Sequence, residues 1–201
     1  MSYSSDFKID NAMFSSRIEG NVLVVNQKKQ FIKMVDEIDQ VFVFHEFLAQ
    51  SIRSKLFDTM LLFNGSEDDA HGESADFLRK AAEPGRDNKL LNRLTSVVNE
   101  LVIALAEMKH TTVYAGSGNI SFFNLNISLA FDYRIVTTGT LFTNTNMKHG
   151  VISKACGYFM PRLIGFDQAF EVLLRERITA EEAFDLGLVD SVIPVADLER
   201  E

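Results

Sequence analysis

The chain has 201 residues, 46% of them hydrophobic, and a formal net charge of −8 at pH 7. This length suits a single domain over residues 1–201 with a sizeable core, and an acidic chain without a Lys/Arg run argues against a nucleic-acid partner. No apolar stretch reaches the ~20 residues of a membrane span, no signal-peptide pattern opens the chain, and Cys156 is the only cysteine, so we expect a cytoplasmic protein without a membrane partner.

The first half of the chain predicts a hairpin followed by alternating helices and strands. Residues 16–19 and the β-branched residues 22–25 flank a Gly20-Asn21 turn. Apolar residues recur at helical spacing over residues 35–56 and again on one face of residues 88–109. Between these two helices we expect a buried strand over residues 59–63, a short helix near Ser74 and a break at Pro84-Gly85.

The second half of the chain continues the alternation with shorter elements. A strand over residues 111–115 leads through a glycine-bearing turn into a short helix, and residues 134–137 and 141–143 form two more strands. Helices are expected from about Ser153, Phe166 and Thr179, the last with Thr179 and Glu182 spaced as a capping box. Strands separated by helices favour an α/β fold with mainly right-handed crossovers.

A series of sequence landmarks in the second half carries a family resemblance. NISLAFDYRIVTTGTLF is followed by MKHGVI, then by PRLIGFDQAFEVLL and ITAEEAFDLGLVDSVIP. In this order they resemble the crotonase superfamily, the enoyl-CoA hydratase/isomerase proteins that hold acyl-CoA thioesters and stabilise their enolates. The resemblance implies a single-domain crotonase-like ββα spiral with a helical C-terminal part. Family members continue with further helices beyond the point where this sequence stops, which implies an open pocket or one completed by a neighbouring subunit.

The resemblance also assigns two backbone N–H donors that hold the thioester oxygen while enolate charge grows on it. The first donor of the family lies in a Gly-Ala-Asp loop after a strand, and Ala75 and Asp76 occupy that place. The second is the middle of three glycines that open a helix; these fall on Phe122, Phe123 and Asn124, so the Phe123 N–H is the expected donor. A glycine lets the backbone approach a ligand closely, whereas phenylalanine adds a ring. The alternative is that Phe122 and Phe123 are core residues of a short buried helix.

Both catalytic glutamates of the family are replaced by amides. The glutamate after the glycines falls on Asn126, and the one after the Phe-Gly-x-Pro turn falls on Asn146. An amide cannot take up a proton at neutral pH, although it can hold a water or orient a carbonyl. Because general acid/base groups contribute ~10²–10⁴ in rate, hydration in the usual manner is disfavoured. Histidine is the side chain whose ordinary pKa lies near neutrality, so His149 and His71 are each either a substitute acid/base or a solvated surface group.

Coenzyme A is the ligand that the resemblance implies, as a thioester substrate or ligand; no tightly bound cofactor and no metal are expected. The family grips CoA along the segment after its first hairpin, which here contains Lys28 and Lys29. These lysines either pair with phosphate as point charges or form a solvated basic turn. Ala75 and Asp76 are expected to contact the same ligand. Cys156 stands at a small-residue position of the family and is interpreted as a buried hydrophobe.

The sequence therefore predicts a lyase or isomerase of the kind found in fatty acid metabolism, acting on an acyl thioester of CoA or of an acyl-carrier phosphopantetheine. Decarboxylation or isomerisation is favoured over hydration, because a decarboxylating substrate generates its own enolate without a protein base. The resemblance implies a homotrimer or hexamer. The alternative is a non-catalytic crotonase homologue that acts as a binding or assembly subunit. The expected site residues are Ala75, Phe123, Asn126, Asn146 and His149.

Overall fold

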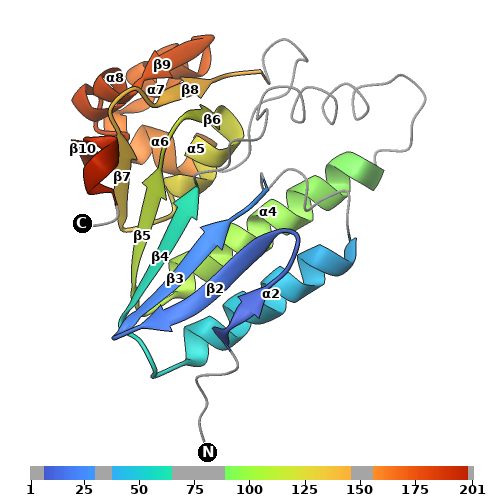
Figure 1. Ribbon diagram of the computed structural model, residues 1–201. Coiled ribbons are helices and arrows are strands. Elements are labelled where there is room, and N and C mark those ends of the chain that lie inside the picture. The colour runs from blue at the N-terminus through green and yellow to red at the C-terminus, as the bar shows by residue number, and fades with distance from the viewer. Residues whose placement is uncertain (1–6, 30–37, 65–88, 146–155, 199–201) are drawn as a thin grey trace, which may run out of the picture.

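The computed structural model describes residues 7–29, 38–64, 89–145 and 156–198, and within these ranges two sheets are flanked by helices (Figure 1). The predicted α/β class is confirmed. The short helix near Ser74, the break at Pro84-Gly85 and the helix start at Ser153 lie outside the described residues. No helix in the described ranges is both long enough and apolar enough to cross a membrane.

The larger sheet has seven strands in the order β1-β2-β3-β4-β5-β7-β10. The first three strands pair antiparallel, and every later pairing is parallel. The predicted hairpin is confirmed and longer than expected, since β2 and β3 pair over six residues each on either side of the Gly20-Asn21 turn. The strands are β1 (Ile9–Asp10), β2 (Phe14–Glu19), β3 (Val22–Gln27), β4 (Thr59–Asn64), β5 (Thr111–Gly116), β7 (Tyr133–Thr137) and β10 (Ser191–Ile193).

Two long helices, α2 (Ile38–Arg53) and α4 (Lys89–Glu107), lie side by side against the sheet (Figure 1). They confirm the helical periodicity of the sequence. The prediction that the first helix reaches residue 56 is wrong, because the Ser54 hydroxyl accepts the Leu56 N–H at 3.1 Å and so takes a backbone donor that a continuing helix would need.

A cluster of five phenylalanine rings packs between the N-terminal strands and α2: Phe7, Phe14, Phe44, Phe47 and Phe57. The ring centroid of Phe14 is 5.1 Å from that of Phe44 and 5.0 Å from that of Phe47. Phe7 lies edge-on to Phe57 at 5.4 Å. Offset and edge-on aromatic pairs add about 0.5–1.5 kcal/mol each beyond the area they bury. These rings therefore fasten α2 to the N-terminal strands.

The smaller sheet contains three short strands, β6 (Asn119–Ser121), β8 (Leu141–Thr143) and β9 (Arg177–Thr179). β6 and β8 run parallel, and β8 and β9 antiparallel. Around this sheet lie the helices α5 (Phe122–Ser128), α6 (Cys156–Ile164), α7 (Phe166–Leu173) and α8 (Ala180–Asp185). The predicted capping box of α8 is confirmed: the Thr179 hydroxyl accepts the Glu182 N–H at 3.2 Å, and the Glu182 carboxylate accepts the Thr179 N–H at 2.8 Å.

Candidate functional site

The candidate site begins where the parallel strands β4 and β5 end together. Asn64 and Gly116 are register partners at these ends, and the Ser117 N–H donates to the Asn64 carbonyl at 3.2 Å. In open α/β sheets, ligands bind beyond the carboxyl ends of parallel strands. The segment that leaves this edge, from Gly116 into α5, is therefore the candidate site.

Two glycines shape the turn from β5 into β6. A Cβ atom on Gly116 would lie 2.6 Å from Ile120 Cδ1 and 3.0 Å from Tyr114 Cε1, closer than packed side chains tolerate. Gly118 has a φ of 73°, in the left-handed region that favours glycine. The turn thus brings β6 close against β5 and directs the chain into α5.

The helix α5 begins at Phe122, as the resemblance predicted. Its N-cap is Ser121, whose hydroxyl accepts the Asn124 N–H at 3.2 Å. The N–H groups of the first helical residues have no acceptor within their own helix. The Phe123 N–H therefore stands at the position that the resemblance assigned to the second donor.

Phe122 and Phe123 are buried, with exposed fractions of 1% and 4%, and both belong to the hydrophobic core. The interpretation of the pair as core residues of a short buried helix is confirmed. Their burial leaves the prediction for the Phe123 N–H untouched, because a backbone donor and its own side chain point in different directions from the helix.

Asn126 is fully buried, and within the described residues neither its amide nitrogen nor its amide oxygen has a hydrogen-bond partner. Ser128, on the same helix, differs because its hydroxyl donates to the Leu125 carbonyl at 2.7 Å. A buried polar group without a partner costs about 1–3 kcal/mol. Such groups are few in native proteins and often serve a binding or catalytic role.

Thr143, the last residue of β8, and Thr145, two residues beyond it, also carry buried polar atoms without a described partner. Thr143 is the register partner of Ser121, the N-cap of α5, and α5 packs against β8. The hydroxyl oxygens of Thr143 and Thr145 are buried and find no partner in the described part of the chain. They occupy the Gly and Pro positions of the Phe-Gly-x-Pro turn. Neither threonine was predicted from the sequence as a site residue. The presence of two hydroxyl residues at the Gly and Pro positions was the feature that could have indicated them.

The contacts of Asp132 and Arg134 are structural. The Asp132 carboxylate accepts the Thr112 N–H at 2.8 Å and the Thr112 hydroxyl at 2.9 Å. The buried Arg134 guanidinium pairs with Asp190 at 2.8 Å and donates to the Phe131 carbonyl at 2.9 Å. These bonds fix the end of α5 and the start of β7 against their neighbours.

Tyr114 fills the buried face of β5, with 1% of its surface exposed. Burial raises the pKa of the Tyr114 phenol far above its ordinary value, and the hydrogen bond from Asn64 partly offsets this. The hydroxyl therefore stays protonated and neutral at physiological pH. It acts as a hydrogen-bonding group beside the site.

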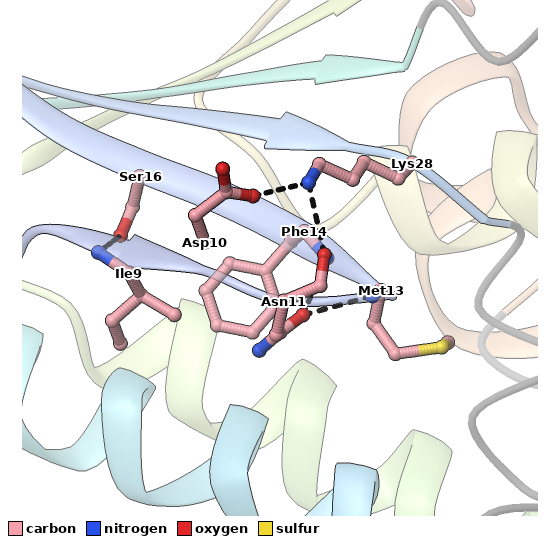
Figure 2. Close-up of polar contacts among 7 residues, drawn as sticks. All are labelled: Ile9, Asp10, Asn11, Met13, Phe14, Ser16 and Lys28. Carbon is pink, nitrogen blue, oxygen red and sulfur yellow. Dashed lines mark hydrogen bonds and ion pairs between the residues drawn. The ribbon is translucent and has the colours of Figure 1, made fainter.

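Figure 2 shows the surroundings of Lys28, which was expected to contact CoA phosphate. Its ammonium forms an ion pair with the Asp10 carboxylate and donates to the Asn11 carbonyl at 2.9 Å. Both charged side chains are exposed, and such pairs are typically worth about 0.2–1 kcal/mol, so a phosphate can compete for the lysine. The Lys29 carbonyl accepts from Gln27 Nε2 at 2.8 Å. Phosphate binding by Lys28 and Lys29 stays a prediction.

Phe123 and Asn126 lie on one short helix, α5, which follows β5 and β6 in the chain and packs against β6, β8 and α6. The other expected site residues lie outside the described residues: Ala75, Asp76, Asn146, His149 and His71. Within the described ranges, no group of three His, Cys, Asp or Glu side chains is arranged to hold a metal ion.

Comparison with known proteins agrees with the resemblance. Residues 76–201 match the family model described as enoyl-CoA hydratase/isomerase. The chain is 29% identical over 105 residues to a probable enoyl-CoA hydratase of Mycobacterium tuberculosis, a stretch that is 51% of this chain and 37% of that relative. It is 32% identical over 110 residues to 4-chlorobenzoyl coenzyme A dehalogenase-1 of Arthrobacter sp, covering 53% of this chain and 40% of the relative. A trans-2-decenoyl-[acyl-carrier-protein] isomerase of Streptococcus mutans is 28% identical over 116 residues, 57% of this chain and 44% of the relative. The matched stretches thus span 37–44% of the length of these curated relatives.

Solved structures of crotonase-type proteins share the fold over most of the chain. An enoyl-CoA hydratase from Bacillus halodurans has a TM-score of 0.71 at 22% identity, covering 93% of this chain and 75% of that one. A structure of Pseudomonas aeruginosa DspI has a TM-score of 0.77 at 18% identity, covering 95% and 77%. The predicted crotonase-like architecture is confirmed.

Proposed function

Because the chain belongs to the enoyl-CoA hydratase/isomerase family of the crotonase superfamily, we propose that it binds an acyl thioester of CoA or of an acyl-carrier phosphopantetheine and stabilises its enolate. The observation that supports this most directly is the start of α5 at Phe122, which leaves the Phe123 N–H without an acceptor in its own helix at the position of the family's second donor. The relatives include a CoA dehalogenase and an acyl-carrier-protein isomerase.

In this proposal, the N–H groups of Ala75 and Phe123 both donate to the thioester oxygen. Charge accumulates on that oxygen as the enolate forms, and losing one such donor typically costs about 3 kcal/mol of transition-state stabilisation. Asp76 borders the bound thioester, and Lys28 and Lys29 contact the phosphates of CoA. The protein acts in the cytoplasm as a homotrimer or hexamer, and light scattering coupled to size exclusion measures that assembly.

Decarboxylation or isomerisation suits this site better than hydration. Asn126 and Asn146 are neutral amides that cannot abstract a proton, which leaves His149 and His71 as candidate acid/base groups. In a malonyl-type thioester, the bond between carbons 2 and 3 breaks, CO₂ leaves, and the electron pair becomes the enolate that the two N–H groups hold. A proton from water then completes the acetyl product. No protein base is required for the bond-breaking step.

The test compares two reactions of the purified chain by liquid chromatography and mass spectrometry. Malonyl-CoA is expected to yield acetyl-CoA above the no-protein control, while crotonyl-CoA is hydrated barely above background. Hydration of crotonyl-CoA at ordinary enzyme rates, roughly 1–10³ s⁻¹, would overturn the proposed reaction preference. A Phe166→Ala variant is a matched control, because Phe166 is 74% exposed on α7 and lies outside the proposed site.

A second candidate function is a non-catalytic crotonase homologue that keeps the fold for binding or assembly. It is favoured by the burial of Phe122 and Phe123 in the core at the glycine positions. If the Phe123 ring fills the space of a thioester, Phe123→Gly strengthens acyl-CoA binding in a calorimetric titration. Removing a buried phenylalanine ring typically costs about 3–5 kcal/mol, so circular dichroism must show that the variant is folded. Adding Asn126→Glu and Asn146→Glu then yields hydratase activity only if the scaffold still presents the pocket.

A further inference from the structure

Three large apolar side chains form an exposed stripe on α7. Phe166, Phe170 and Leu174, which is the C-cap of the helix, have exposed fractions of 74%, 59% and 54%. Tyr158 and Leu163 are also exposed on α6, which packs against α7. An isolated exposed apolar residue is ordinary in a globular protein, whereas several on adjoining elements mark an interaction surface.

The spacing of the stripe suits packing against a second helix. Residues four apart advance by about 40° around a helix and by ~6 Å along its axis, so Phe166, Phe170 and Leu174 make a continuous ridge. Ridges of this kind interdigitate with those of another helix when the two axes cross at about −50°. On α7 itself, Ala169 and Val172 are buried against the rest of the chain. The ridge therefore remains open after α7 has packed onto its own protein.

One flank of the stripe is acidic. Asp167 and Glu171 each follow a stripe residue by one position, so both lie about 100° around the helix from that residue and on the same side. Both side chains are exposed. In the part of the chain that the structure describes, neither carboxylate forms an ion pair. Both are therefore available to cations on a bound molecule.

Two arginines near the stripe in sequence are engaged elsewhere. Arg175 pairs with Glu182 at 3.7 Å. The Arg162 guanidinium lies 3.7 Å from the centroid of the Tyr158 ring and donates to the Tyr158 carbonyl at 2.6 Å. The uncompensated charge of α7 is thus negative, which disfavours an anionic lipid surface and complements a basic partner.

We propose that the stripe of Phe166, Phe170 and Leu174 is the docking surface for an amphipathic helix of another protein, whose apolar face is flanked by Lys or Arg side chains. Apolar contact with the stripe supplies most of the affinity, and cations paired with Asp167 and Glu171 orient the helix. A second copy of this chain fits less well, because in a symmetric pair centred on Phe170 the two Glu171 carboxylates lie on the same flank and repel each other. The docking surface is independent of the proposed thioester chemistry.

The test uses a fluorescein-labelled model peptide of leucine and lysine at helical spacing, ~14 residues or about four turns long. The same peptide with glutamate in place of lysine is its matched control. In anisotropy titrations of the full chain, the lysine peptide is expected to bind at least about tenfold more tightly than the glutamate peptide, and its affinity should fall with added salt. Equal affinities, or no binding of the lysine peptide, would overturn the proposal.

Matched variants locate the binding on α7. The double variant Phe166→Ser and Phe170→Ser is expected to weaken binding of the lysine peptide by about tenfold or more. Phe42→Ser is the control, because Phe42 is a 69% exposed phenylalanine on a different helix, α2, and its loss should leave the affinity unchanged. Equal affinities of the double variant and the Phe42 variant would rule out the stripe as the binding surface. All three substitutions replace exposed rings, and circular dichroism checks that each variant is folded.

The same double variant distinguishes the other possible occupants. Sedimentation equilibrium without peptide is expected to give the same mass for the wild type and the double variant. A larger wild type would mean that a second copy covers the stripe, which would overturn the proposal. Vesicles of phosphatidylcholine and phosphatidylserine are expected to bind neither protein. Vesicle binding by the wild type that is lost in the double variant would assign the stripe to a lipid surface instead.

Discussion

The Asn64 amide donates a 2.7 Å hydrogen bond to the hydroxyl of Tyr114, 50 residues later in the chain. Asn64 is the last residue of β4, and Tyr114 lies on the neighbouring parallel strand β5, with both side chains buried. The Tyr114 ring also packs edge-on against Phe131 at 5.7 Å. The bond thus joins the last residue of β4 to the C-terminal half of β5.

Tyr114→Phe is expected to lower the free energy of unfolding by about 1–3 kcal/mol, because it leaves the buried Asn64 amide without its acceptor. Urea denaturation followed by circular dichroism measures the change. Tyr133→Phe serves as the control: Tyr133 is 57% exposed, so its loss should stay within about 0.5 kcal/mol. Equal effects of the two variants would contradict the assigned role of the buried bond.

Alkaline pH should destabilise the native chain through Tyr114. Its folded pKa is raised by burial, so the unfolded chain loses this proton first as the pH rises above about 10. The stability contribution is complete below that pH and falls above it, by at most about 1.4 kcal/mol per pH unit for one proton. Tyr114→Phe is expected to show a shallower decline between pH 10 and 11 in urea titrations. An unchanged slope would show that Tyr114 does not control this titration.

Gly116 and Gly157 are expected to respond in opposite ways to alanine. A Cβ on Gly116 would lie 2.6 Å from Ile120 Cδ1, so Gly116→Ala should cost about 1–3 kcal/mol through overpacking. Gly157 lies in α6 with nothing within 4 Å of such a Cβ, and Gly157→Ala should be neutral or stabilise by up to about 1 kcal/mol. The thermal unfolding midpoints of the two variants, each compared with that of the wild type, measure these opposite effects. A tolerated Gly116→Ala would mean that β6 can move away from β5.

Thr179→Ala removes the capping hydroxyl of α8 and is expected to lower the free energy of unfolding by about 1 kcal/mol. Thr179→Ser is the matched control, because it keeps the oxygen that accepts the Glu182 N–H. Chemical denaturation of both variants gives the comparison. If serine costs as much as alanine, the contribution of Thr179 comes from its methyl group and not from the cap.

The sequence predicted the long, periodic elements better than the short ones. The apolar faces of α2 and α4 are visible over four turns or more, and the β-branched residues of β3 mark a strand. The three-residue strand β8 was predicted with its observed bounds, whereas β6, β9 and β10, of the same length, were not. Three residues are too few to display an alternation, and such strands are held by their neighbours in the sheet. Two-residue β1 was missed for the same reason.

The sequence predicted the part of the candidate site that depends on local residue order. It did not predict the contacts that depend on which strands and helices lie side by side. The start of α5 at Phe122 followed from alignment of the residues after it. The bond between Asn64 and Tyr114 depends on which strands lie side by side, and no local pattern marks it. That the Asn126 amide has no partner among the described residues likewise depends on how distant segments pack, which no local pattern shows.

The order of strands in the larger sheet also bears on how the chain assembles during synthesis. The strands of this sheet lie side by side in the same order in which they occur along the chain. None of the described strands therefore has to be inserted between two strands made earlier. A chain that leaves the ribosome at about 5–20 residues per second can therefore extend the sheet at an edge that is already formed. Protease protection of ribosome-arrested chains of increasing length should accordingly appear strand by strand from the N-terminal side. Until Ser191–Ile193 is made, β7 presents the growing edge, and its unpaired backbone groups are then open to association with other nascent chains.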